Sequence, residues 1–277
     1  MTHFLERTGS WFKNRYLSAV NEKQMLWARA AYEHMLSIAT LGRGVPRLIN
    51  GRDLIRISVH HRYVDEIYEP EVFEFFRREL KADDIIFDVG AYIGVYSIIL
   101  SKYLGTRGRI YAFEPAPASV KLLTTHLEMN NADKSVEVLA CGVGERRGSG
   151  RLFAIGDHIQ NSFSSATFGT DVSASALEVP VICLDDFCRE RSISPTFVKV
   201  DTEGWELQVL RGAENLLSTS RGTRYLVEMH PYAWGAAGYD ENTFKDFCAR
   251  HRLKVEPLSG QRNVFSEYGQ VVISAVT

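Results

Sequence analysis

Residues 85–94 read IIFDVGAYIG, an apolar run that ends in an aspartate and two glycines. A run of this length that stops at a glycine is typical of a buried strand followed by a turn and a helix. Gly90 permits a tight turn with close backbone approach, and Gly94 lets the next helix begin against the sheet. The segment therefore predicts the first strand–turn–helix unit of an α/β domain.

Strand-like and helix-like segments alternate from here to the C-terminus. Apolar runs occur at 85–90, 109–114, 136–141, 196–201, 225–230, 254–258 and 270–276, with helix-length segments at 94–104, 117–130, 204–219 and 240–252. Continuous apolar strands separated by helices indicate a mostly parallel sheet that is covered on both faces. Two further runs, 151–155 and 179–184, flank a polar loop at 156–175 that contains NSFSSATF. We expect this loop to close over a substrate and exclude water.

The N-terminal part has a different pattern. Residues 11–41 predict amphipathic helices and residues 53–59 a half-exposed strand, and Pro70 opens a further helix. We therefore expect a helical extension over residues 1–80 and a catalytic domain over 81–277. Residues 1–60 hold nine Lys and Arg against four Asp and Glu. This extension is expected to cover the active site, to form a homodimer face, or to meet an anionic acceptor or a membrane surface.

Composition excludes several classes of protein. The chain has 277 residues, a net charge of −2 and 45% hydrophobic residues, which is typical of a globular protein. A near-neutral charge argues against a nucleic-acid partner, which would need a surplus of Lys and Arg. No apolar run reaches the about 18–20 residues of a membrane span, and no secretory signal is evident. Four sparse cysteines fit a reducing compartment, so we expect a cytoplasmic protein with no integral membrane segment.

The strand ends point to a nucleoside cofactor. In an open parallel sheet, ligands bind beyond the carboxyl ends of the strands. Glu114 ends the second strand and can accept hydrogen bonds from both hydroxyls of a ribose. Tyr92 stands where a dinucleotide fingerprint has a glycine, and its bulk would crowd a pyrophosphate, whereas Asp88 suits a sulfonium cation. These features favour S-adenosylmethionine over NAD, with an NAD-dependent oxidoreductase as an alternative.

The chain from about residue 68 to 231 resembles the FkbM-type methyltransferases. The resemblance is carried by YEPEVFEFF, DDIIFDVGAYIGVYSIILSKYLG, GRIYAFEPAP, KVDTEGWELQVLRGAENLL and LVEMHP, in this order. It implies a Rossmann-like class I methyltransferase fold, an α/β doubly wound sheet of seven strands whose last strand is antiparallel. It also implies an S-adenosylmethionine-dependent enzyme that methylates hydroxyls of small molecules such as sugars, glycolipids or secondary metabolites.

The resemblance assigns cofactor residues in this chain. It implies that Asp88, Gly90 and Gly94 line the methionine end of the cofactor and that Glu114 holds the ribose. We expect further cofactor contacts at these strand ends from Ala91, Tyr92, Pro115, Cys141 and Gly142. The family usually has Asn where this chain has Tyr92, which puts the contacts of that residue in doubt.

The segment KVDTEGWE at residues 199–206 carries the candidate catalytic groups. Lys199 and Asp201 share a face of their strand, and Glu203 lies beyond it in the turn. A hydroxyl nucleophile needs its proton removed as it attacks, which calls for a positioned base. Asp201 and His230 are both candidates for this base, and Glu203 is a candidate to bind substrate hydroxyls.

Other interpretations of these residues stay open. Glu203 and Glu206 are also explained by the preference for acids at a helix N-terminus, and His230 by a structural hydrogen bond. An oxygen-ligand metal site from Asp201, Glu203 and Glu228 is an alternative, although we expect no bound metal. N-methylation of an amine, and a binding module without catalysis, are alternative functions. Tyr232 and Trp234 form either an aromatic wall for a substrate ring or ordinary partly buried packing.

Overall fold

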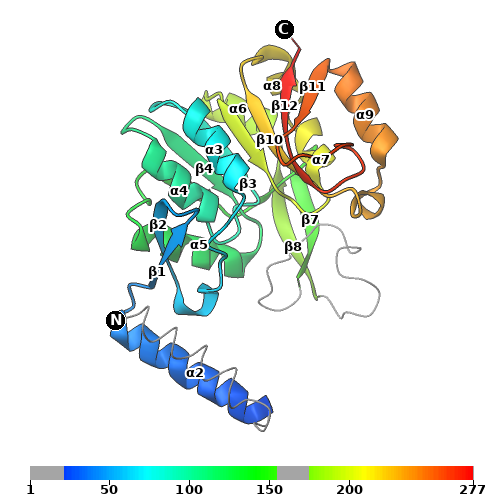
Figure 1. The fold of residues 1–277 in the computed structure, drawn as a ribbon. Helices are drawn as coiled ribbons and strands as arrows, with labels where there is room; N and C mark the ends of the chain where they lie inside the picture. The colour runs from blue at the N-terminus through cyan, green and yellow to red at the C-terminus, as the bar shows by residue number, and fades with distance from the viewer. Residues whose placement is uncertain (1–21, 155–174, 277) are drawn as a thin grey trace. The chain divides into compact units, whose positions relative to one another are not determined.

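The computed structural model describes residues 22–154 and 175–276 (Figure 1). The NSFSSATF segment and the first predicted helix lie outside these residues. The chain divides into two compact units, Met1–Tyr68 and Glu69–Thr277. Helix α3 (Pro70–Glu79), which a boundary at residue 80 assigns to the extension, thus lies in the second unit.

The described part of the first unit contains helix α2 (Glu22–Ala39), a hairpin of β1 (Val45–Ile49) and β2 (Asp53–Ile57), and a short 3-10 helix, η2 (Val59–His61). The expected strand at 53–59 corresponds to β2, whereas β1 has no counterpart among the expected elements. The signal for the hairpin is the pair Asn50-Gly51, whose φ angles of 50° and 67° lie in the left-handed region. An Asn-Gly pair between two apolar runs favours a hairpin turn for this reason.

The second unit is built on a seven-stranded sheet in the order β11-β12-β10-β9-β3-β4-β5. The strands are β3 (Ile85–Val89), β4 (Arg109–Phe113), β5 (Val136–Leu139), β9 (Phe197–Val200), β10 (Arg224–Met229), β11 (Leu253–Pro257) and β12 (Gly269–Ala275). Pairs from β5 through to β10 are parallel, whereas β12 is antiparallel to both of its neighbours. The predicted doubly wound sheet with an antiparallel last strand is therefore confirmed.

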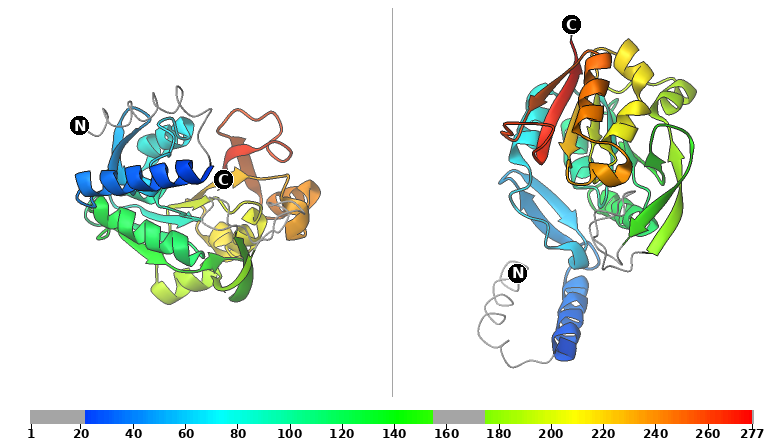
Figure 2. Two further views of the ribbon diagram at one scale, coloured as in Figure 1. Left: turned by 90° about the horizontal axis from the view of Figure 1, so that it is seen from below. Right: turned by 90° about the vertical axis from the view of Figure 1, so that its right-hand side faces the viewer.

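Helices cover both faces of this sheet (Figures 1 and 2). One face carries α3, α4 (Val95–Tyr103) and α5 (Pro117–Met129), and the other carries α6 (Leu184–Arg191), α7 (Glu206–Arg211), α8 (Glu214–Thr219) and α9 (Glu241–Arg250). The single helix predicted over 204–219 is two helices, separated at Gly212. A Cβ atom on Gly212 would lie 2.1 Å from the carbonyl oxygen of Gly144, so the break allows close backbone packing.

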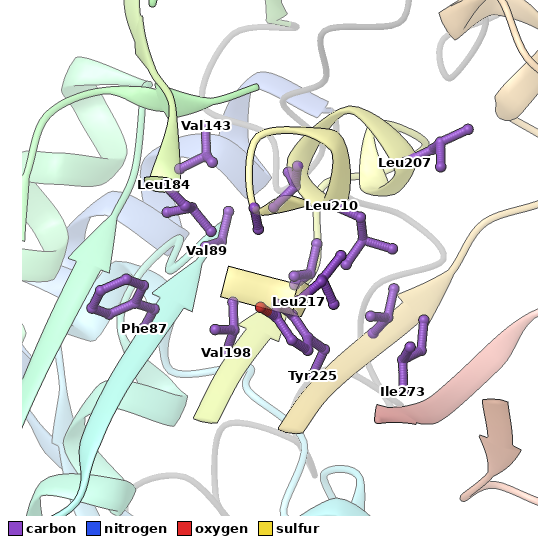
Figure 3. Close-up of a cluster of buried hydrophobic side chains, with 14 of the residues drawn as sticks. Phe87, Val89, Val143, Leu184, Val198, Leu207, Leu210, Leu217, Tyr225 and Ile273 are labelled. Carbon is purple, nitrogen blue, oxygen red and sulfur yellow. The ribbon is translucent and has the colours of Figure 1, made fainter. Parts of the chain in front are cut away.

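The alternation of side chains along the strands separates core from site. Phe87, Val89 and Val198 point into a buried cluster with Leu207 and Leu210 of α7 (Figure 3). Because neighbouring residues of a strand face opposite sides, Asp88 and Lys199 point toward α3 and α4 instead. These two residues are direct partners in the register of β3 and β9. The strands therefore place apolar groups on one face and charged groups on the other.

A second, three-stranded sheet in the order β6-β8-β7 follows β5. It comprises β6 (Gly142–Val143), β7 (Gly148–Ala154) and β8 (Ser175–Ile182), with β7 and β8 antiparallel. These strands contain most of the two predicted runs at 151–155 and 179–184, although Leu184 already belongs to α6. The chain leaves the main sheet at Cys141, close to the predicted cofactor edge.

Candidate active site

The turn after β3 joins the two central strands at their carboxyl ends. The N–H groups of Gly90 and Ala91 donate to the carbonyl oxygen of Phe113 at 3.0 and 3.1 Å, which ties the turn to the end of β4. Gly90 has a φ of 82°, and a Cβ atom there would lie 1.8 Å from the carbonyl oxygen of Asp201. Gly94 has a φ of 88° at the start of α4. The backbone conformation at both positions therefore requires glycine.

Glu114 is fixed by two backbone donors. Its side chain is 4% exposed, and its two oxygens accept from the N–H groups of Tyr92 and Ala116, each at 2.9 Å. Burial raises the pKa of Glu114 to about 7, although these two N–H groups act in the opposite direction. Each carboxylate oxygen retains a second acceptor position, so the group can still receive hydrogen bonds from a ligand.

The other predicted cofactor residues lie around Glu114. Pro115 is half-buried, and Cys141 is buried at the neighbouring end of β5. Burial raises the pKa of the Cys141 thiol to about 11, so it is neutral near pH 7. Gly142 pairs with Val181 in the second sheet. The structure thus brings the turn after β3, the end of β4 and the end of β5 to one edge.

Lys199 links two carboxylates in a buried ion chain. Its Nζ lies 3.2 Å from Asp201 Oδ2 and 3.9 Å from Asp88 Oδ1. Asp88 is fully buried, and its Oδ2 accepts from Ser97 Oγ at 2.7 Å. Burial raises the pKa of Asp88, while Lys199 opposes this rise. Burial also disfavours the ammonium of Lys199, but Asp201 and Asp88 raise its pKa above the usual value.

Two further carboxylates face Lys199, and the sequence singled out one of them, Glu228, as an alternative metal ligand with Asp201 and Glu203. Glu69 accepts a hydrogen bond from Tyr96 of α4, and burial raises its pKa. Glu228 at the end of β10 accepts hydrogen bonds from Tyr268 and, at 3.3 Å, from Gln270 Nε2. Burial, and then the charges of Asp201 and Glu69, raise the pKa of Glu228 to about 9. The centre therefore holds more carboxyl groups than cations.

His230 lies between two acids of the segment that joins β9 to α7. Its Nδ1 is 3.0 Å from Glu206 Oε1, and its Nε2 is 3.6 Å from Glu203 Oε2. Burial by itself would lower the pKa of His230, but the hydrogen bond with Glu206 and the charges of Glu206, Asp201 and Glu203 raise it to about 10. Burial also works against charge on Asp201, yet Lys199 and His230 hold the pKa of Asp201 below its usual value.

Glu206 has more contacts than a helix-terminal acid needs. It is fully buried in the first turn of α7 and accepts from Gly204 N and Trp234 Nε1, each at 2.8 Å. Trp234 is only 1% exposed, so it belongs to the core. Tyr232 is exposed, and its hydroxyl donates to Glu203 Oε2 at 3.4 Å. Of the two aromatic residues, only Tyr232 is open to solvent beside the predicted catalytic groups.

The same turn contains a geometry that suits a cation. One ligand atom each from Asp201, Glu203 and His230 lies within 4.8 Å of the others. The set differs from the alternative considered from sequence, since His230 takes the place of Glu228. Ligation would require His230 Nε2 to be unprotonated, whereas its raised pKa favours the protonated ring. The expectation that the site works without a metal stays a prediction.

Two buried polar atoms at this edge have no hydrogen-bond partner among the described residues. They are Asp88 Oδ1 and the hydroxyl oxygen of Tyr92. Buried polar atoms are nearly always paired, so an unpaired atom in a cleft points to a ligand. Both belong to the set that the sequence assigns to the cofactor. Their positions fit a polar ligand bound at the turn after β3.

Glu69, which the sequence did not single out, and Glu228, which it considered only as an alternative metal ligand, are held by tertiary contacts. Glu69 and Tyr96 are separated by 27 positions, and Glu228 and Tyr268 by 40. The glutamate before Pro70 carries no motif that would reveal its partner. Only the alternation along β10, which puts Glu228 on the side opposite Val227, would have indicated its direction.

None of the helices within residues 22–154 and 175–276 has the length and apolar composition of a membrane span.

The chain is similar to several known methyltransferases. It is 29% identical over 196 residues to hexuronic acid methyltransferase AglP of Haloferax volcanii, covering 68% of this chain and 71% of that protein. It is 27% identical over 165 residues to methyltransferase sdnD of Sordaria araneosa, covering 49% of this chain and 62% of that one, which is less than two thirds of its length. An O-methyltransferase from Bacillus cereus, crystallised in complex with SAH, aligns over 100% of both chains with 10% identity and a TM-score of 0.46.

Residues 88–254 match the profile of the methyltransferase FkbM domain, and this segment contains every predicted catalytic and cofactor residue. The match extends over more than half of the chain. The protein therefore belongs to the FkbM methyltransferase family, and its methyl donor is S-adenosylmethionine.

Proposed function

We propose that the protein transfers a methyl group from S-adenosylmethionine to a hydroxyl of a small molecule, with Asp201 as the base. The observation that carries this proposal is the position of Asp201, whose carboxylate is held ionised by Lys199 and His230 at the carboxyl end of β9. The similarity to AglP, whose name specifies a hexuronic acid, supports a sugar as the acceptor.

The cofactor is assigned to the edge formed by β3, β4 and β5. Glu114 would accept from the ribose hydroxyls, and Asp88 would face the methionine end. Gly90, Ala91 and Gly94 would line the turn, with Tyr92, Pro115, Cys141 and Gly142 completing the contacts. Asp88 Oδ1 and the Tyr92 hydroxyl, which have no hydrogen-bond partner among the described residues, support this assignment. When bound, the cofactor supplies an electrophilic methyl group on a positively charged sulfur.

Asp201 would receive the acceptor's proton. A bond forms between the hydroxyl oxygen and the methyl carbon while the carbon–sulfur bond breaks, and S-adenosylhomocysteine leaves with the electron pair on sulfur. The oxygen becomes positively charged as it is alkylated, so its proton grows far more acidic than a carboxylic acid. A carboxylate with a lowered pKa can therefore accept this proton, and a positioned base contributes about 10²–10⁴-fold in rate.

The surrounding residues would orient Asp201 and the acceptor. Lys199 fixes one oxygen of Asp201 at 3.2 Å. His230 carries a proton near pH 7 because of its raised pKa, so we assign it as a positioning cation and not as the base. Glu203 lies next to His230 and the exposed Tyr232, and we assign it to the acceptor hydroxyls.

Two measurements test this function. Calorimetry with S-adenosylhomocysteine is expected to show binding by the wild type and strongly reduced binding after Asp88→Ala or Glu114→Ala. A mass-spectrometric screen of hydroxyl and amine acceptors is expected to show the gain of one methyl on a hydroxyl. Absence of binding would refute the cofactor assignment. If the screen showed methylation of amines only, O-methylation would be refuted and the activity would be N-methylation.

A further inference from the structure

A pocket with no role in the chemistry above lies between the second sheet and the start of α7. Its volume is about 620 Å³, and its lining includes Arg146, Arg151, Phe153, Trp205 and Gln208. Arg146 belongs to the turn after β6, and Arg151 and Phe153 belong to β7, which is an edge strand. Trp205 and Gln208 lie at the start of α7. The pocket is therefore formed entirely within the second unit.

Both walls of the pocket are attached to the proposed reaction centre. Trp205 follows directly on the turn that carries Asp201 and Glu203. On the opposite wall, Leu152 of β7 packs in a small buried cluster with Ala116, whose N–H donates to Glu114. A ligand in the pocket would thus be held by segments that also position the candidate base and the candidate ribose acceptor.

The pocket lining contains two arginines, Arg146 and Arg151, and one glutamate, Glu145. Glu145 lies 3.3 Å from Arg146 and 3.7 Å from Arg211, which is outside the lining, so its charge is shared between two arginines. Glu178 is opposite Arg151 in the strand register. Its Oε1, however, accepts from Ser149 Oγ at 2.6 Å. Among the residues that the structure describes, Arg151 has no ion pair with a carboxylate. Arginine suits this position because its planar donors match carboxylate and phosphate oxygens.

Aromatic side chains share the pocket with these cations. Arg151 Cζ lies 5.9 Å from the centre of the Phe153 ring, and Trp205 lines the same pocket. A flat aromatic face can pack against the C–H face of a sugar ring, since both surfaces are apolar. The Gln208 amide offers both a donor and an acceptor for hydroxyls. Rings, cations and an amide together match a polyhydroxylated ring with an anionic substituent.

We propose that this pocket binds the acceptor as an anionic sugar, with a carboxylate or a phosphate on Arg146 and Arg151 and the ring against Trp205. The inference rests on the proposed function and adds the chemical class of its substrate. The carboxylate of Asp201, whose lowered pKa keeps it ionised, repels the anionic substituent, while the two arginines attract it. These charges favour an acceptor that presents an uncharged hydroxyl, and not its anionic group, to Asp201.

The test is calorimetry on the full chain saturated with S-adenosylhomocysteine, titrated with D-glucuronate, glucose 6-phosphate and glucose. At least one anionic sugar is expected to bind about tenfold or more tightly than glucose, because charge-assisted hydrogen bonds are among the strongest. The two anionic probes distinguish a carboxylate from a phosphate. The double variant Arg146→Ala/Arg151→Ala is expected to lose this preference, whereas Arg107→Ala, at an exposed arginine outside the pocket, is expected to keep it.

The outcomes separate the two proposals. If S-adenosylhomocysteine itself fails to bind, the proposed function fails. If it binds but glucose is bound as tightly as both anionic sugars, or the double variant keeps the preference, only the anionic-sugar inference fails. Trp205→Phe, which retains a ring, is expected to bind the anionic sugar more tightly than Trp205→Ala. Both arginines are exposed, so the melting temperature of the double variant is expected to match the wild type.

Discussion

Gly90 and Asp201 touch through their backbones, with the Cα of the glycine turned toward the carbonyl oxygen of the aspartate. A Cβ atom on residue 90 would lie 1.8 Å from that oxygen. The cofactor turn and the candidate base are therefore packed against each other without any side chain between them. Any side chain at residue 90 must therefore displace the backbone of Asp201.

Gly90→Ala is expected to lower both stability and cofactor binding. Overpacking usually destabilises by about 1–3 kcal/mol, and the φ of 82° adds strain for any residue with a Cβ. Thermal unfolding and calorimetry with S-adenosylhomocysteine measure the two effects. Gly222→Ala is the matched control, because nothing lies within 4 Å of a Cβ at that position. Equal melting temperatures for the two variants would contradict the packing argument.

Asp201→Asn is expected to reduce kcat about 10²–10⁴-fold, while the affinity for S-adenosylhomocysteine changes far less. The asparagine keeps the shape of the side chain but removes its capacity to take a proton. Since the pKa of Asp201 lies below its usual value, kcat of the wild type at saturating cofactor is expected to stay level between about pH 5.5 and 8. If kcat of the wild type instead changed with pH near neutrality, and this change were absent in His230→Asn, His230 would be the base.

Cofactor affinity is expected to fall as the pH drops through about 7, because Glu114 has a pKa of about 7 and ribose hydroxyls donate to its ionised form. Protonation would weaken binding about tenfold at one pH unit below this pKa. Calorimetry with S-adenosylhomocysteine across this range measures the effect. Glu114→Gln is expected to bind weakly and without this pH dependence. A wild-type affinity that is constant from about pH 6 to 8 would rule out Glu114 as the ribose acceptor.

Glu228→Gln is expected to stabilise the protein increasingly as the pH rises. Folding raises the pKa of Glu228 from 4.5 to about 9, so the folded state retains a proton that the unfolded state releases. The resulting stability is fully present below pH 4.5 and is lost as the pH rises toward about 9. Glutamine stays neutral and removes this loss. Thermal unfolding at several pH values measures it, with Glu256→Gln on the exposed surface of β11 as the control.

Tyr92→Asn is expected to preserve folding but to weaken cofactor binding, because it removes the hydroxyl that we assign to a cofactor contact. Tyr92 has a φ of 47°, which Asn adopts more readily than other residues with a side chain, and its backbone N–H to Glu114 is unaffected. Tyr92→Val is expected to unfold at a lower temperature, because a β-branched residue resists this conformation. If both variants melted at the same temperature, backbone conformation would not explain the choice of residue.

The order of the elements was predictable because each strand of the main sheet is a short apolar run bounded by turns. The ends of β3, β4 and β9 carry residues whose types already indicate a cofactor and a base. Only the second strand of the first hairpin was predicted, because the turn signal of Asn50-Gly51 was not used to search for a strand before it. The division of α7 from α8 was missed because it depends on the contact between Gly212 and Gly144, which lie 68 positions apart.

The side-chain network was less accessible from sequence. His230 is a sensible base by residue type. Burial works against its charge, but the contact with the buried Glu206 and the charges of Asp201 and Glu203 raise its pKa. Trp234 is a plausible substrate wall by composition, yet it is buried against the same glutamate. Such roles depend on burial and on partners far away in the chain, which a motif does not contain. The left-handed φ of Tyr92, in contrast, is a conformation that Asn adopts more readily than other residues with a side chain.

The ionised carboxylate of Asp201 has a consequence for turnover. The cofactor enters with a positively charged sulfur and leaves with a neutral one. A carboxylate that stays ionised at the end of β9 attracts the first form more than the second. Methyl transfer therefore weakens the attraction between protein and cofactor at the moment when the cofactor is spent. This difference in charge favours the replacement of S-adenosylhomocysteine by a new S-adenosylmethionine. Raising the ionic strength should narrow the difference in affinity between these two molecules.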